Sequence, residues 1–106
     1  MAKKAITDAR ENIAAMLHAH PSEIIFTGSG TESINLALQG VTKTCVENGN
    51  HILTTAIEHH AVLETCRFLE SEGFQITYLP VDKNGILDSK NIFKAIRDKT
   101  VLVSIG

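Results

Sequence analysis

Two short groups of residues have the side chains and backbone types that chemistry requires. The first is the glycine-bearing turn Thr27-Gly28-Ser29-Gly30-Thr31-Glu32, and the second is the pair Glu58-His59. Glycines let the backbone approach a ligand closely, and the free N–H groups at a helix start attract phosphate. An imidazole can stack on an aromatic ring or transfer a proton near neutral pH. Together the two groups indicate a phosphorylated, ring-bearing ligand held by Gly30, Thr31 and His59.

Each group also has a purely structural interpretation. The turn can be a tight connection in which Ser29 or Thr31 caps the helix that follows, although the local pattern favours ligand binding over capping alone. His59, taken by itself, is better explained as a loop residue bonded to the backbone. Glu32 lies in the first helical turn, where a bound phosphate would repel it, so we expect its carboxylate to point away from the ligand.

Other site types fit less well. Gly28-x-Gly30-x-x-Ser33 lacks the third glycine of the dinucleotide-binding fingerprint, although Glu58 could imitate its ribose-binding acid. No Gly-Lys-Ser/Thr is present, which excludes a P-loop. The histidines share no face at ligand spacing, and Cys45 and Cys66 form neither a metal-ligand nor a redox motif. We therefore predict no metal site and two reduced, partly buried cysteines.

Hydrophobic periodicity predicts the elements that must position these groups. Short apolar runs predict strands over residues 23–26, 51–55, 74–79 and 100–105. Helical spacing predicts helices over 3–18, from the turn past Gly40 to Cys45, over 60–72, and from Asp88 or Ser89 through Ile96. Asn48-Gly49-Asn50 is expected to cap the second helix in a left-handed conformation, and Gly73 to stop the third.

Strands and helices in alternation predict an α/β fold, with a mostly parallel sheet, helices on its faces and right-handed crossovers. Because the carboxyl ends of parallel strands share one edge, residues 28–31, 58–59 and Gly106 should converge there. The run 101–105 has the composition of a strand buried on both faces, yet the sequence stops one residue later. We therefore expect residues 1–106 to be part of a larger domain, exposing apolar sheet and an unpaired edge.

Composition limits the function classes. A chain of 106 residues with 43% hydrophobic content suits one domain, and a net charge of −2 with interspersed signs gives no footprint for nucleic acid or an anionic membrane. No apolar run approaches the length of a bilayer-spanning helix, and the start lacks the apolar segment of a secretory signal. The default expectation is a cytoplasmic location.

At these same residues the chain resembles a known family, the cysteine desulfurases, within the class V aminotransferase group of fold type I pyridoxal-phosphate enzymes. The most specific matching blocks are residues 23–27, 30–37 and 58–67, and further blocks follow in family order to the last residue. The family turn usually reads Ser-Gly-Ala-Thr-Glu, whereas this chain has Gly28-Ser29-Gly30 before Thr31. The departure keeps the residues small and implies a somewhat looser turn.

The resemblance implies that Gly30 and Thr31 bind the phosphate of pyridoxal 5′-phosphate and that His59 stacks on its pyridine ring and assists proton transfer. It implies a cysteine desulfurase that converts L-cysteine to L-alanine plus an enzyme-bound persulfide, supplying sulfur for iron–sulfur clusters and thiolated cofactors. It also implies a homodimer that passes sulfur to acceptor proteins.

The resemblance equally implies which groups lie beyond residue 106. In the family, a cofactor asparagine, the aspartate at the pyridine nitrogen, the Schiff-base lysine and the catalytic cysteine all come later, and Cys45 and Cys66 do not match that cysteine. We expect residues 1–106 to be the N-terminal part of the large cofactor-binding domain, inactive alone. The alternatives are another class V enzyme, such as a selenocysteine lyase or aminotransferase, a non-catalytic module that binds a phosphate or a partner subunit, and a dinucleotide-binding domain.

Overall fold

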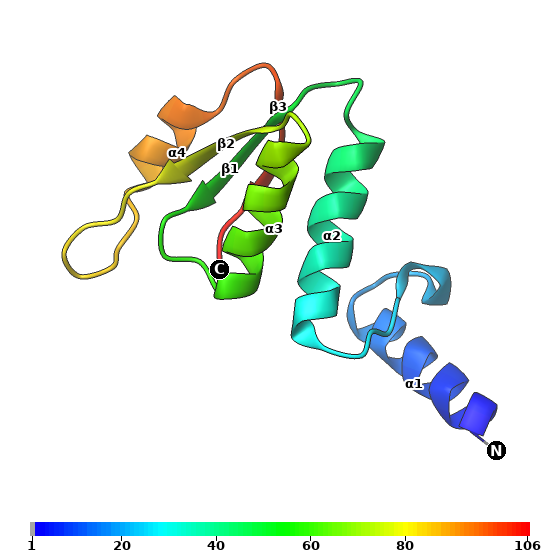
Figure 1. Cartoon of the computed structure of the whole chain (residues 1–106). Coiled ribbons are helices and arrows are strands. Elements are labelled where there is room, and N and C mark those ends of the chain that lie inside the picture. Colours follow the sequence, from blue (N-terminus) through cyan, green and yellow to red (C-terminus); the bar gives the residue numbers. More distant parts are fainter. Residues whose placement is uncertain (1) are drawn as a thin grey trace.

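The computed structural model describes residues 2–106 and contains a three-stranded sheet with four α-helices (Figure 1). The helices are α1 (Ala2–Met16), α2 (Gly30–Thr44), α3 (His60–Ser71) and α4 (Ser89–Ala95). The strands are β1 (His51–Thr55), β2 (Gln75–Leu79) and β3 (Thr100–Ser104), and the 3₁₀ turn η1 (Pro21–Glu23) precedes α2. The α/β fold class predicted from the sequence is confirmed.

The sheet is parallel throughout, with β1 between β2 and β3. All five residues of β1 are buried, whereas β3 is an edge strand of half-buried residues, and Val103 is 42% exposed. Helix α3 connects the central strand β1 to β2 at one edge of the sheet. Helix α4 then connects β2 to β3 at the other edge. Right-handed crossovers are the rule between parallel strands, and this rule places the two helices on opposite faces of the sheet. Helix α2 packs beside α3 (Figure 1).

The core lies between the sheet and the α2–α3 layer. Ile52, Ile76 and Leu102 stand side by side on three neighbouring strands and face this layer. The helices contribute a set of buried apolar side chains, namely Leu38, Val62, Cys66 and Leu69. Burial of this apolar surface is what joins the two helices to the sheet.

The predicted strand over residues 23–26 is wrong. Residues 21–23 form η1, Ile24 is extended, and residues 24–27 belong to no helix or sheet. Within residues 2–106 no strand lies beside this segment to complete a ladder of hydrogen bonds, and a strand needs one. Arg10 holds the segment instead, because its Nε donates to the Ile24 carbonyl at 3.3 Å and its guanidinium lies 5.1 Å from the Phe26 ring centre.

The predicted left-handed cap around Gly49 is also wrong. The helix α2 ends at Thr44, and its C-cap, Cys45, has φ −97° and ψ 10°. Gly49 is required for a different reason: a Cβ there would lie 2.1 Å from the carbonyl oxygen of Lys99. The prediction that Gly73 ends the third helix is confirmed, since this residue follows α3 and has φ 102°.

Candidate cofactor site

The turn before α2 is stabilised by a reciprocal pair of side-chain hydrogen bonds. Ser29 is the N-cap, and its Oγ accepts from the Glu32 amide at 3.1 Å. The Glu32 carboxylate folds back and accepts from the Gly28 amide at 2.8 Å. The capping interpretation is therefore correct for Ser29, and the Glu32 carboxylate lies on the Gly28 side of the turn.

Capping leaves other donors of the turn available. Within residues 2–106, the amides of Gly30 and Thr31 have no hydrogen-bond partner. A Cβ built at Gly30 meets nothing within 4 Å, and Thr31 is exposed. Two unpaired amides, a hydroxyl and the positive end of the α2 dipole surround this open space, which fits the phosphate of a cofactor.

His59 occupies the equivalent position before α3. Its Nδ1 accepts from the Ala61 amide at 3.1 Å, so the imidazole is the N-cap of the helix. The structural interpretation of His59 therefore holds for this one nitrogen. In the neutral ring the proton then sits on Nε2, which has no partner within residues 2–106. The exposed ring keeps its face and Nε2 available for a ligand.

Glu58 holds the loop that carries His59. Its Oε1 accepts from the Gly106 amide at 2.8 Å, and its Oε2 accepts from the Thr55 hydroxyl. The Ala56 amide also donates to the carbonyl of Leu79 at 2.9 Å. These bonds join the carboxyl ends of all three strands, a role that the sequence could not reveal because Thr55 and Gly106 lie far apart along the chain.

The first turns of α2 and α3 lie at the same end of the molecule, next to the C-terminus (Figure 1). Thr31 and Ala61, which follows His59 by two residues, line a single cleft of about 280 Å³ between the two helices. The structure thus places Gly30, Thr31 and His59 at one rim. The strand-end rule accounts for His59, which follows β1, but not for Gly30 and Thr31, because the segment before them belongs to no sheet.

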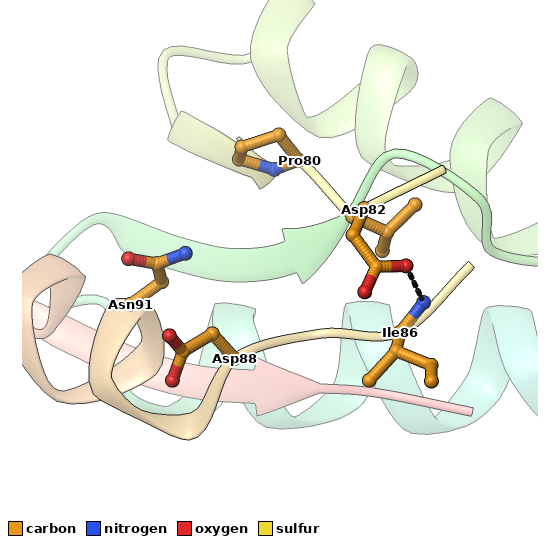
Figure 2. A pocket seen from close by; sticks show the side chains of 6 residues that line it. Pro80, Asp82, Ile86, Asp88 and Asn91 are labelled. Carbon is orange, nitrogen blue, oxygen red and sulfur yellow. Dashed lines mark hydrogen bonds between the residues drawn. The ribbon is translucent and has the colours of Figure 1, made fainter. Parts of the chain in front are cut away.

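A second cleft, of about 510 Å³, lies in the loop after β2 (Figure 2). Its two carboxylates hold the loop together. Asp82 Oδ1 accepts from the amides of Asn84 and Ile86 at 2.8 and 2.9 Å, and Asp88 caps α4 through the Lys90 amide. These bonds use one oxygen of each carboxylate and give both side chains a structural role in the loop.

Cys66 is not arranged for nucleophilic chemistry. Cys66 is fully buried in the core, and burial raises the pKa of its thiol to about 11, with the carboxylates of Glu70 and Glu58 adding to the effect. The thiol is therefore protonated at neutral pH and is not a nucleophile. Cys45 is half-buried at the end of α2. Within residues 2–106, no cluster of three or more metal-ligating side chains is present.

None of the helices in residues 2–106 has the length and apolar character required to cross a bilayer.

Comparison with known proteins places these elements in a wider context. The model of the aminotransferase class-V family matches residues 1–106. A curated relative, the cysteine desulfurase IscS of Dictyoglomus turgidum, is 52% identical over 103 residues, which are 97% of this chain and 26% of the relative. The chain therefore spans about a quarter of the length of the curated relatives that it matches.

Solved structures contain the same arrangement. A NIFS-like protein superposes with a TM-score of 0.88 at 43% identity, covering 98% of this chain and 29% of the other. A structure described as SspA in complex with cysteine gives a TM-score of 0.86 at 46% identity, covering 98% of this chain and 30% of the other.

Proposed function

Because the chain belongs to the aminotransferase class-V family, we propose that it forms the N-terminal part of the large cofactor-binding domain of a cysteine desulfurase. The resemblance to cysteine desulfurases seen in the sequence is confirmed, since the curated relatives at about 50% identity carry that name. The observation that carries the proposal is the pair of unpartnered amides at Gly30 and Thr31 at the same rim as the exposed ring of His59.

The cofactor of this family is pyridoxal 5′-phosphate. In the proposed site its phosphate accepts hydrogen bonds from the amides of Gly30 and Thr31 and from the Thr31 hydroxyl. The positive end of the α2 dipole adds to this attraction. When bound, pyridoxal phosphate supplies an electron sink for bond cleavage in an amino-acid substrate.

His59 has two roles in the proposed site. Its ring stacks on the pyridine ring, and its Nε2 holds or moves a proton at the substrate side. The hydrogen bond from Ala61 to Nδ1 fixes the ring and directs the mobile proton to Nε2. The bonds from Glu58 to Thr55 and Gly106 keep the loop beneath it in place.

The proposed substrate is L-cysteine, as the name of the relatives and the cysteine in the SspA structure suggest. The whole enzyme would release L-alanine and leave the sulfur as a persulfide on an enzyme cysteine. The buried, protonated Cys66 does not suit that role. We place the persulfide cysteine and the Schiff-base lysine outside residues 1–106, as the family resemblance implies. A homodimer, sulfur-acceptor proteins, iron–sulfur assembly and a cytoplasmic location complete the proposal.

The phosphate site is tested with pyridoxine 5′-phosphate, which keeps the ring and phosphate but has no aldehyde to react with surface lysines. Calorimetric titration of the 106-residue chain should show saturable binding. The substitution T31A should weaken it about tenfold, the effect of losing one hydrogen bond to a charged group.

Thr44 offers a matched control, because it is an exposed threonine at the opposite end of the same helix. T44A should leave the dissociation constant unchanged. Equal affinity in T31A and T44A, or the absence of saturable binding in the parent chain, would contradict the proposed site.

A further inference from the structure

We propose that the contact between Asn35 and Thr65 is a positioning link that sets the first turn of α2 against that of α3. It thereby fixes the distance between the phosphate-binding turn and His59. The inference rests on the proposed function. Asn35 and Thr65 touch no ligand in it, and both act through the residues that do.

The link lies in a row of polar contacts between the two halves of the site. Asn35 Nδ2 donates to the Thr31 carbonyl at 3.1 Å. Thr65 Oγ1 lies 2.9 Å from Asn35 Oδ1 and 2.8 Å from the Ala61 carbonyl, and its single proton serves either acceptor. The Ala61 amide donates to His59 Nδ1 at 3.1 Å.

The orientation of the Asn35 amide is determined by its neighbours. Gln39 Nε2 donates to Asn35 Oδ1 at 3.2 Å, alongside the Thr65 hydroxyl, while Nδ2 faces the Thr31 carbonyl. A flipped amide would set Oδ1 against the Thr31 carbonyl oxygen and Nδ2 against Gln39 Nε2, and both contacts would be repulsive. The side chain therefore has one favourable arrangement, which transmits the position of α3 to the first turn of α2.

The remaining contacts between α2 and α3 are mainly apolar, centred on Leu38, Val62 and Cys66. Apolar packing is non-directional and tolerates small shifts of one helix along another. A hydrogen bond is directional, and Thr65 is only 3% exposed, so water cannot readily replace its partner. This directional, part-buried bond therefore sets the register of the two first turns more sharply than the apolar contacts do.

A positioning role makes a specific prediction about ligands. Inorganic phosphate needs only the turn at Gly30 and Thr31, whereas pyridoxine 5′-phosphate needs that turn and His59 at the correct separation. Loss of the link should weaken the binding of pyridoxine 5′-phosphate and leave the binding of inorganic phosphate unchanged. General loss of structure would weaken both.

The test uses T65V in the full 106-residue chain, because valine keeps the volume and removes the hydroxyl. T65V should weaken pyridoxine 5′-phosphate binding about fivefold and change inorganic phosphate binding by less than about twofold. T65S, which restores the hydroxyl, should recover the parent affinity.

Thr42 gives a matched control. It is fully buried in α2, and its hydroxyl bonds to the carbonyl four residues earlier, as that of Thr65 does, but to its own helix alone. T42V should therefore lose stability as T65V does and leave the ratio of the two affinities unchanged.

Amide and imidazole NMR spectra of the ligand-free chain provide a readout independent of binding. T65V should shift the Gly30 and Thr31 amide resonances and the His59 ring resonances, and T42V should leave the ring resonances in place. If the parent chain binds no pyridoxine 5′-phosphate, the proposed function fails and these shifts still decide the link. The proposed link would be overturned if T65V left these resonances unchanged, or if it reduced the affinity for both ligands equally.

Discussion

The two ends of the sheet carry the same residue types in opposite circumstances. At the amino ends of the strands, His51 is fully buried, and its ring nitrogens lie 2.6 Å from the Thr100 hydroxyl and 2.7 Å from that of Thr77. At the carboxyl ends, His59 is exposed and has one ring nitrogen bonded. Both histidines flank the same strand, so burial and hydrogen bonding decide what each can do.

Glycines show the same contrast. A Cβ at Gly49, at the amino end, would lie 2.1 Å from a backbone oxygen, whereas a Cβ at Gly30, at the carboxyl end, would meet nothing within 4 Å. At the amino end the position of the Gly49 Cβ is blocked by backbone, and both ring nitrogens of His51 have partners. At the carboxyl end the space at Gly30 is open and one ring nitrogen of His59 has no partner within residues 2–106, which is what ligand binding requires.

The largest difference in the free energy of unfolding is expected when alanine replaces each of the two glycines. G49A must displace the backbone at Lys99, whose carbonyl accepts from the His51 amide at 3.0 Å, and should cost about 4 kcal/mol or more. G30A should leave the free energy of unfolding unchanged or raise it by up to about 1 kcal/mol, because alanine favours a helix. Urea unfolding followed by circular dichroism measures both. Similar costs for the two substitutions would remove the contrast between the ends.

The second-largest difference in the free energy of unfolding is expected between substitutions of the two histidines. H51A removes a buried ring and two hydrogen-bond partners, and should lower the free energy of unfolding by about 3 kcal/mol. H59A removes only a helix cap and should cost about 1 kcal/mol. Should H51A fail to fold, H51Q, which keeps polar groups in the space, must still cost more than H59A in urea unfolding. The reverse order would show that the rim, and not the amino end, holds the sheet together.

A pH titration sharpens the comparison further. Burial, and then the Arg97 guanidinium, lower the pKa of His51 below its ordinary value of 6.5. Below about pH 6.5 the unfolded chain therefore binds a proton that the folded chain does not. The free energy of unfolding should fall with decreasing pH, by at most about 1.4 kcal/mol per pH unit from this group.

Chemical unfolding at a series of pH values between 5 and 8 measures this slope, in conditions of constant ionic strength. H51Q should remove the contribution of His51, and H60Q, which alters an exposed histidine at the start of α3, should retain it. A slope that is the same in the parent chain and in H51Q would contradict the assignment of the acid-side loss to His51.

Much of this arrangement could be predicted from the sequence because it depends on neighbours along the chain. Hydrophobic periodicity located α2, α3 and all three strands to within a few residues, and turn chemistry identified Gly73. It left Asp88 or Ser89 as the cap of α4, and the structure selects Asp88. The alternation of strands and helices implied a parallel sheet, and such a sheet places His59, which follows β1, at its carboxyl rim. Thr31 lies at the same end because α2 packs beside α3, and not because a strand of the sheet precedes it. Their roles toward a cofactor stay predictions.

Tertiary contacts decided the rest. Residues 23–26 have the composition of a strand, but a strand forms only where a partner lies beside it, and the sheet of residues 2–106 provides none there. Gly49 is required because the backbone of Lys99, fifty residues later in the chain, lies against it. Asn35 likewise contacts Thr65, which is thirty residues away in the sequence. Local pattern determines which residues can form an element, whereas the space and hydrogen-bond partners around each side chain depend on how distant segments pack.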